Sequence, residues 1–269
     1  MQTGYKSKIN YCDAEYFNLS DNETRIATAR HPVKVPTVEQ IRHVITTMPD
    51  GSDIELRDRA VVAFIFLTGA RDSAVASARL KNVDVVGRAL YQDARDMNTK
   101  FRKSFPTFLF PVGKDIEAIV SSWIILLREV KLYGNDAPLF PTTNIAVGDD
   151  GLFQLDGLKP EPWRSAGPIR RIFKEAFERA GLPYFKPHSV RHALVELGEK
   201  ICRSPEEFKA WSQNLGHEGV MTTFNSHGTV SHRRQREVIA RLGDPIGPET
   251  PVDVEVLAEA VARRLKART

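Results

Sequence analysis

The chain has 269 residues, 42% of them hydrophobic, which suits one large or two ordinary globular domains with a real core. Lys and Arg number 38 against 34 Asp and Glu, so the net charge of +4 is compatible with a polyanionic partner without requiring one. The two cysteines, Cys12 and Cys202, form no metal-ligand spacing and no disulfide framework, which favours a reducing compartment. No signal-peptide core and no run near the roughly 20 apolar residues of a membrane span occurs, so we expect a cytoplasmic protein.

The first predicted elements are two helices. Residues 1–35 are polar and poorly periodic, and we interpret them as an arm or linker. Order is predicted to begin at Thr37, which can cap a helix together with Gln40 in a capping box. A second helix is predicted over residues 55–68, so densely apolar that it should be buried, with Gly69 at its C-terminal cap.

The middle of the chain predicts a small antiparallel sheet. A short helix is predicted at 72–79, and two strands at 88–91 and 104–110 flank a basic turn at 98–103. Pro106 lacks a backbone N–H and is therefore expected to place the second strand at an edge.

The second half of the chain is predicted to be mostly helical. A helix is expected over 115–133, and residues 134–167, with several Gly, Pro and Asp and little periodicity, are predicted to form a long surface loop. Further helices are predicted at 168–180, from His188 onward, from Ser204 to Leu215, at 231–242 and in the amphipathic tail at 251–268. The fold class predicted from these elements is mainly α with a small antiparallel β-sheet.

Two motifs centred on arginine could hold an anion. Arg71 ends the segment Leu67-Thr68-Gly69-Ala70-Arg71, and its guanidinium suits a phosphate because it offers a fixed fork of donors and keeps its charge. Alternatively, Arg71 bonds the last carbonyls of its own helix. In the second motif, His188 and Arg191 lie within one helical turn on the same side. Alternatively, His188 at the helix start forms hydrogen bonds only with the backbone, and Arg191 lies on the surface.

Other residues of the chain add donors and proton carriers. Lys100 and Lys103 both lie in the basic turn, and the plain structural interpretation is that their charges are simply solvated there. Gly216 is expected to end a helix in the left-handed conformation and thereby to fix the direction of His217. His188 and His192 have the spacing of a zinc-binding pair, but no third ligand stands at a recognisable spacing.

Four motifs follow one another along the chain: Thr-Gly-x-Arg, the turn lysine, His-x-x-Arg and Leu-Gly-His. Their order resembles the catalytic domain of the tyrosine recombinase (phage integrase) family, and the resemblance covers about residues 36–243. The stretch Leu-Gly-His-Glu-x-Val-x-Thr-Thr-Phe that begins at Leu215 is similar to one bacterial branch. The resemblance implies a phosphate held by Arg71 and Arg191, a leaving 5′ oxygen protonated by Lys100, proton transfer assisted by His188 and a hydrogen bond to a non-bridging oxygen from His217.

The chain departs from this family at His227, where the family has its tyrosine nucleophile in a Ser-Tyr-Gly context. None of the six tyrosines follows His217 in the sequence. Three interpretations stay open. The nucleophile has been lost, naturally or by deliberate substitution; His227 itself attacks phosphorus; or a neighbouring hydroxyl, Ser226 or Thr229, takes its place.

The resemblance also implies partners and an organisation. The partner would be double-stranded DNA in the bacterial nucleoid, bound without metal or nucleotide cofactor and without a membrane, by a homo-oligomer of four copies on two DNA sites. We divide the chain into an arm at 1–35 that lacks a full core-binding domain, a catalytic domain at 36–243, and a linker with an amphipathic helix at 244–269 that docks in cis or in trans. Two alternatives remain: a non-catalytic DNA-binding pseudo-recombinase acting as regulator or partner subunit, and a metal-dependent hydrolase built on the histidines.

Overall fold

The computed structural model describes residues 35–99, 102–147, 151–216 and 232–242. The helices in chain order are α3 (Val38–Thr47), α4 (Asp53–Thr68), α5 (Asp72–Ala76), the 3₁₀ turn η1 (Leu80–Asn82), α6 (Lys114–Ile125), its π-helical continuation η3 (Leu126–Val130), α7 (Gly167–Arg179), α8 (Pro187–Ile201), α9 (Pro205–Asn214) and α10 (His232–Leu242). The strands are β1 (Val83–Asp84), β2 (Ala89–Gln92), β3 (Phe105–Phe108), β4 (Pro141–Val147) and β5 (Phe153–Pro162).

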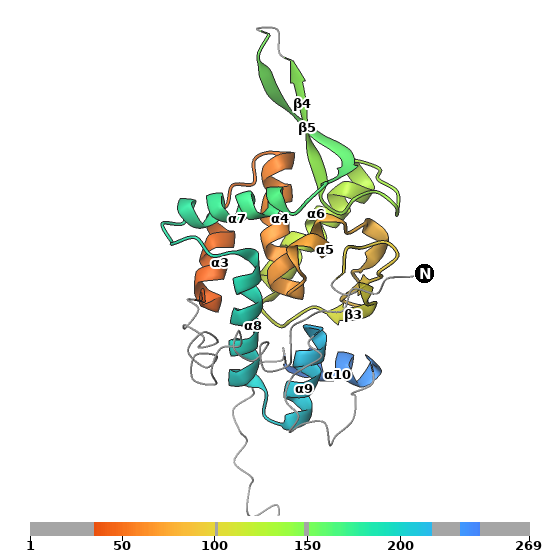
Figure 1. The fold of residues 1–269 in the computed structure, drawn as a ribbon, viewed down its shortest axis with the longest axis vertical. Helices are drawn as coiled ribbons and strands as arrows, with labels where there is room; N and C mark the ends of the chain where they lie inside the picture. Colours follow the sequence, from red (N-terminus) through yellow and green to blue (C-terminus); the bar gives the residue numbers. More distant parts are fainter. Residues whose placement is uncertain (1–34, 100–101, 148–150, 217–231, 243–269) are drawn as a thin grey trace, which may run out of the picture. The chain divides into compact units, whose positions relative to one another are not determined.

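Helix α4 lies at the centre of the helical body, in contact with α3, α6, α7 and α8 (Figure 1). Every residue from Ala60 to Thr68 is buried, because the helix is apolar on all sides and its neighbours cover each face. Its predicted C-terminus is confirmed, because Gly69 caps the helix with a φ of 59°. The helix begins two residues earlier than predicted, at Asp53, where the Ser52 side chain accepts a hydrogen bond from the backbone N–H of Glu55. The capping box of Thr37 and Gln40 at the start of α3 is also present.

The strands β1, β2 and β3 form an antiparallel sheet in that order. Pro106 of β3 lies opposite Tyr91 of β2. Strand β3 is at the edge of the sheet, as the proline predicts. The turn between β2 and β3 is the predicted basic turn, and within it Lys100 lies outside the described residues.

Residues 134–167 are not the long surface loop that the sequence predicts, because β4 and β5 pair there as an antiparallel hairpin that projects from the helical body (Figure 1). The base of this hairpin is anchored by Arg57 of α4, whose Nη1 donates to the carbonyl of Pro141 at 3.0 Å and to Oγ1 of Thr143 at 2.9 Å. Arg57 and Pro141 are 84 residues apart in sequence, so no local pattern reveals the anchor. The β-bulges between Pro141 and Thr142 and between Thr143 and Ile145 also interrupt the alternation that marks a strand.

The fold is therefore mainly α, as predicted, but it has two small antiparallel sheets instead of one. In the part of the chain that the structure describes, no helix combines the length and the apolar character needed to cross a lipid bilayer. The predicted arm and the predicted helix at 251–268 lie outside the described residues.

Candidate functional site

The turn after α4 gives Arg71 a defined position. The Thr68 hydroxyl donates to the carbonyl of Phe64 at 2.7 Å and accepts from the backbone N–H of Ala70 at 3.1 Å, so it bridges both sides of the turn. The Gly69 N–H donates to the carbonyl of Ile65, which closes the helix.

The last carbonyls of α4 are not capped by Arg71, which was the alternative role considered for it. The carbonyls of Phe64 and Ile65 accept from the turn itself, and that of Leu67 accepts from the N–H of Phe110 at 2.7 Å. The Arg71 side chain is half-buried just beyond the helix end. Its guanidinium is therefore available for a ligand.

Arg191 of α8 is buried, with 4% of its surface exposed, and joins two turns that are distant in sequence. Its Nη1 donates to the carbonyl of Gly69, and its Nη2 donates to the carbonyl of Leu215 at 2.5 Å. The alternative of a surface arginine at this position is wrong. Arg191 thus connects the Thr-Gly-x-Arg turn to the start of the Leu-Gly-His turn.

The two arginines form a centre of positive charge. Burial and the nearby charge of Arg71 lower the pKa of Arg191 to about 10, and burial also lowers the pKa of Arg71. The carboxylate that follows Arg71 in the chain, Asp72, is bonded by Nε of Arg170 at 2.8 Å. Within the described ranges neither Arg71 nor Arg191 has a carboxylate at ion-pair distance, and the buried Nε of Arg191 has no hydrogen-bond partner. Uncompensated paired cations favour the binding of an anion.

His188 lies on the first turn of α8 beside this centre. Burial, followed by the charges of Arg191, His192 and Arg71, lowers its pKa, which favours the neutral imidazole. A neutral imidazole can accept a proton on one nitrogen and donate from the other. The rings of His188 and His192 meet edge to face at 5.1 Å. Within the described ranges no group of three His, Cys, Asp or Glu side chains is placed to hold a metal ion.

The Leu-Gly-His turn follows α9, and Gly216 has the predicted left-handed conformation, with a φ of 67°. A Cβ atom at this position would lie 2.6 Å from the ring of Phe105 in β3, so both the conformation and the packing require glycine. His217, which comes next, lies outside the described residues, as does His227. The structure therefore brings together Arg71, His188 and Arg191 of the predicted set, and it does not describe Lys100, His217 or His227.

The sequence analysis missed a buried polar network that holds the Leu-Gly-His turn against the sheet. Asn214 is fully buried; its Oδ1 accepts from the N–H of Phe108 at 2.7 Å and its Nδ2 donates to the carbonyl of Phe108 at 2.8 Å. The Thr107 hydroxyl donates to the Asn214 carbonyl at 3.3 Å and accepts from Nε2 of Gln92 at 2.8 Å. Asn214 therefore ties the end of α9 to β3, the strand that leads out of the basic turn. Its place at the end of α9, directly before the apolar residue Leu215, was the available signal.

We predict that Asn214→Ala lowers the free energy of unfolding by roughly 2–3 kcal/mol, because it leaves the N–H and the carbonyl of Phe108 buried without partners. Urea denaturation measures this change. Asn135→Ala, which removes the same side chain from an exposed loop position, is the matched control and should change stability by less than about 0.5 kcal/mol. Equal losses in the two variants would show that the network does not hold the turn.

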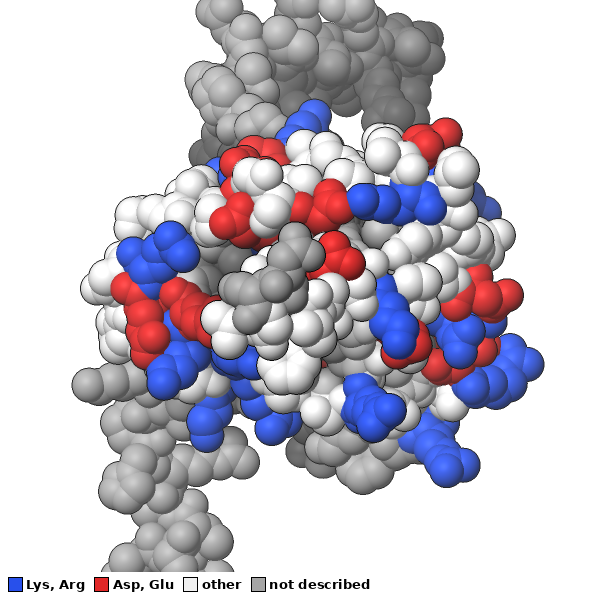
Figure 2. Space-filling model, turned by 90° about the horizontal axis from the view of Figure 1, so that it is seen from above, with Lys and Arg blue, Asp and Glu red and all other residues white. Residues whose placement is uncertain are grey.

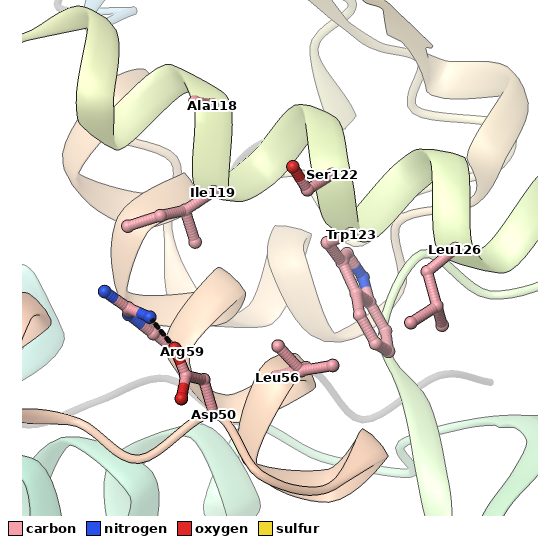
Figure 3. A pocket seen from close by; sticks show the side chains of 8 residues that line it. All are labelled: Asp50, Leu56, Arg59, Ala118, Ile119, Ser122, Trp123 and Leu126. Carbon is pink, nitrogen blue, oxygen red and sulfur yellow. Dashed lines mark hydrogen bonds and ion pairs between the residues drawn. The ribbon is translucent and has the colours of Figure 1, made fainter.

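A separate hollow lies between α4 and α6, with a volume of about 320 Å³ (Figure 3). Apolar side chains of the two helices line most of it, and an ion pair between Arg59 and Asp50 lies at its side, with Nη1 and Oδ2 at 2.6 Å. None of the predicted site residues lines this hollow. It is therefore distinct from the arginine centre.

Comparison with known proteins identifies recombinases as relatives. No protein-family profile matches the chain. It is 25% identical over 199 residues to tyrosine recombinase XerC of Chromohalobacter salexigens, covering 73% of this chain and 57% of that protein. It is 24% identical over 212 residues to tyrosine recombinase XerD of Neisseria meningitidis, covering 76% of this chain and 62% of that protein. The chain thus spans less than two thirds of the length of these relatives.

Among solved structures, the integrase from mycobacterium phage Brujita is similar with a TM-score of 0.49 and 15% identity, covering 83% of this chain and 62% of that one. The lambda integrase catalytic core is similar with a TM-score of 0.47 and 17% identity, covering 69% of this chain and 96% of that one. The Xer relatives, which share sequence with most of this chain, support its assignment to the tyrosine recombinase family.

Proposed function

We propose that this chain is a site-specific recombinase or integrase-like protein that binds double-stranded DNA, with strand cleavage lost or altered because His227 stands at the nucleophile position. The observation that carries the proposal is the pair Arg71 and Arg191, whose charges lie close together. Among the described residues, no carboxylate lies at ion-pair distance from either guanidinium. A phosphodiester is the anion that two guanidinium groups bind well, because both can donate in a bidentate manner.

The proposed roles follow from the positions of the residues. Arg71 contacts the scissile phosphate directly. Arg191 uses two of its donors to hold the surrounding turns and offers the others, including its Nε, to the phosphate. His188, neutral before DNA binds, exchanges a proton near the phosphate.

The remaining roles are proposed from the resemblance. Lys100 protonates the leaving 5′ oxygen, and His217 stabilises the charge that develops on a non-bridging oxygen. In a tyrosine-bearing form, the hydroxyl gives its proton to His188 as its oxygen bonds to phosphorus, the bond from phosphorus to the 5′ oxygen breaks, and that oxygen takes a proton from the Lys100 ammonium. No metal or nucleotide enters this step, and four copies on two DNA sites in the bacterial cytoplasm are the proposed assembly.

A second function, DNA binding without strand transfer, is favoured by one feature of the site. The arginine centre is built by the ends of α4 and α9 and by α8, through the hydrogen bonds from Arg191 to the carbonyls of Gly69 and Leu215. The chain would then act as a regulator or partner subunit, because loss of the nucleophile leaves the phosphate contacts in place.

The test is a suicide-substrate assay with nicked DNA carrying sites selected by binding to this chain. We expect His227→Tyr to form a covalent protein–DNA product that survives denaturing electrophoresis, whereas the unchanged chain and His227→Phe do not. Retention of product in chelator would exclude a metal-dependent hydrolase.

Other outcomes identify the alternatives. An acid-labile product from the unchanged chain would make His227 the nucleophile, because a phosphoramidate hydrolyses in acid and a phosphotyrosine does not. Binding by all three proteins without covalent product would support the binding function. Absence of sequence-selective DNA binding in all three would overturn the proposal.

A further inference from the structure

The hairpin of β4 and β5 has one apolar face. In its register Ile145 lies opposite Leu155, and Val147 lies opposite Phe153. Directly opposed residues of an antiparallel pair point to the same face, as do residues two apart on one strand, so these four side chains share a face. They are exposed by 60% (Ile145), 65% (Val147), 83% (Phe153) and 70% (Leu155).

The opposite face of the hairpin is polar. Ala146 pairs with Gln154 there, and Nδ2 of Asn144 donates to the Asp156 carboxylate at 3.0 Å. Alternation of this kind normally marks a strand pair with one side against a core. In this hairpin the apolar side faces outward, and a two-stranded ribbon gains stability when such a face is covered.

The hairpin is held firmly at its base. The Arg57 guanidinium, bonded to β4, also lies over the ring of Trp163, 5.3 Å from its centre. Trp163 stacks with Phe140 at 6.4 Å, and Phe140 is part of the core. The apolar face is therefore presented on an anchored support.

The charges around the hairpin do not favour a polyanion. Lys159 pairs with Glu161 at 2.7 Å, and Asp156 is bonded by Asn144. Seen from above, the molecule shows basic and acidic side chains interspersed on this side (Figure 2). A field of mixed sign does not attract DNA, so the partner of the apolar face should itself be apolar.

We infer that this face, defined by Ile145, Val147, Phe153 and Leu155, binds the same face of a second copy of the chain. An isologous contact requires a self-complementary patch, and a face made of two apolar cross-strand pairs can meet the same face of a second copy about a two-fold axis. Hydrophobic side chains of each copy then cover those of the other.

The area of the face predicts a weak association. With roughly 150 Å² for an aliphatic side chain and about 200 Å² for phenylalanine, the exposed fractions amount to roughly 450 Å² per copy. Two copies bury about 900 Å², less than the roughly 1,200–2,000 Å² of stable interfaces. The contact should therefore form at high protein concentration, or between copies brought together by another ligand.

Sedimentation equilibrium over a concentration series tests this inference. The full chain should show a mass that rises with concentration, and Phe153→Thr/Leu155→Thr should weaken the association by about tenfold or more. Threonine retains β propensity, so the hairpin is preserved. The matched control is Val86→Thr/Val130→Thr, which removes two apolar side chains exposed by 96% and 69% elsewhere and should leave the association unchanged.

Four results would overturn the inference. The first is a full chain that stays monomeric throughout the series, and the second is an association that survives the hairpin variant. The third is a loss of association in Leu257→Asp/Val261→Asp, which would show that the apolar stripe of the tail, not a second hairpin, occupies the face. A hairpin variant that weakens DNA binding with its association intact would assign the face to DNA and also contradicts the inference. Because the readout is protein mass without DNA, failure here leaves the proposed function untouched.

Discussion

Arg191→Ala is expected to lower the free energy of unfolding by roughly 2–4 kcal/mol, the largest stability effect of any single substitution at the site. The substitution leaves the carbonyls of Gly69 and Leu215 buried without their donor and removes the packing of a side chain that is 4% exposed. The substitution also relieves the charge repulsion between Arg191 and Arg71, which makes the decrease in the free energy of unfolding smaller than the lost contacts alone would give. Urea denaturation gives the free energy, and thermal unfolding should shift by about 2–4 °C per kcal/mol for a chain of this size.

Arg191→Lys separates charge from geometry. Lysine keeps the positive charge, but its single ammonium cannot reproduce the planar fork that reaches two carbonyls. We expect most of the stability loss of the alanine variant to remain. Full recovery of stability in the lysine variant would show that charge, and not the bridge between the two turns, is what Arg191 supplies.

Arg171→Ala is the control for removal of an arginine as such. Arg171 is 74% exposed on α7, and its ion pair with Glu175 is long, at 3.9 Å. Exposed pairs of this kind contribute little, so this variant should unfold within about 0.5 kcal/mol of the unchanged chain.

The features predicted correctly from the sequence are those with local chemical signals. The cap of α3 depends on two residues three positions apart, and the left-handed conformation of Gly216 depends on one glycine directly after a helix. At the start of α9 only half of a capping box forms: the Ser204 side chain accepts from the N–H of Glu207, but the Glu207 carboxylate accepts from the N–H of Arg203 and not from that of Ser204. A local motif therefore predicts the start of a helix better than it predicts every partner.

The features that the sequence did not predict depend on contacts between distant residues. The hairpin of β4 and β5 is fixed by Arg57, and Asn214 is fixed by a strand more than 100 residues earlier. The burial of Arg191 is of the same kind, because only the folded chain places the two carbonyls that accept from it. The order of the motifs therefore predicted that the two arginines act as a pair. That Arg191 also bridges two turns could be seen only in the folded chain.

Arg71→Ala should weaken DNA binding by about 10- to 100-fold while leaving stability unchanged or slightly increased. A hydrogen-bonded contact from a guanidinium to a phosphate contributes roughly 1.5–3 kcal/mol, which corresponds to this range. Stability should not fall, because Arg71 is half-buried, and its charge lowers the pKa of Arg191 and so opposes ionisation of that residue. Fluorescence anisotropy with a labelled duplex, at several salt concentrations, measures the affinity and its salt dependence.

Arg171→Ala again provides the control, because it changes the net charge by the same amount. Burial raises the pKa of Asp58, near the start of α4, and the charge of Arg171 is close enough to oppose this rise slightly, whereas Arg71 follows the end of that helix. If Arg71 contacts a phosphate, its removal should reduce the slope of log affinity against log salt by about 0.9, and removal of Arg171 should not. Equal losses of affinity in the two variants would mean that general charge attracts the DNA, and that the paired arginines do not form a phosphate site. A loss confined to Arg71, with folding intact, would assign the arginine centre to binding independently of whether position 227 can carry out cleavage.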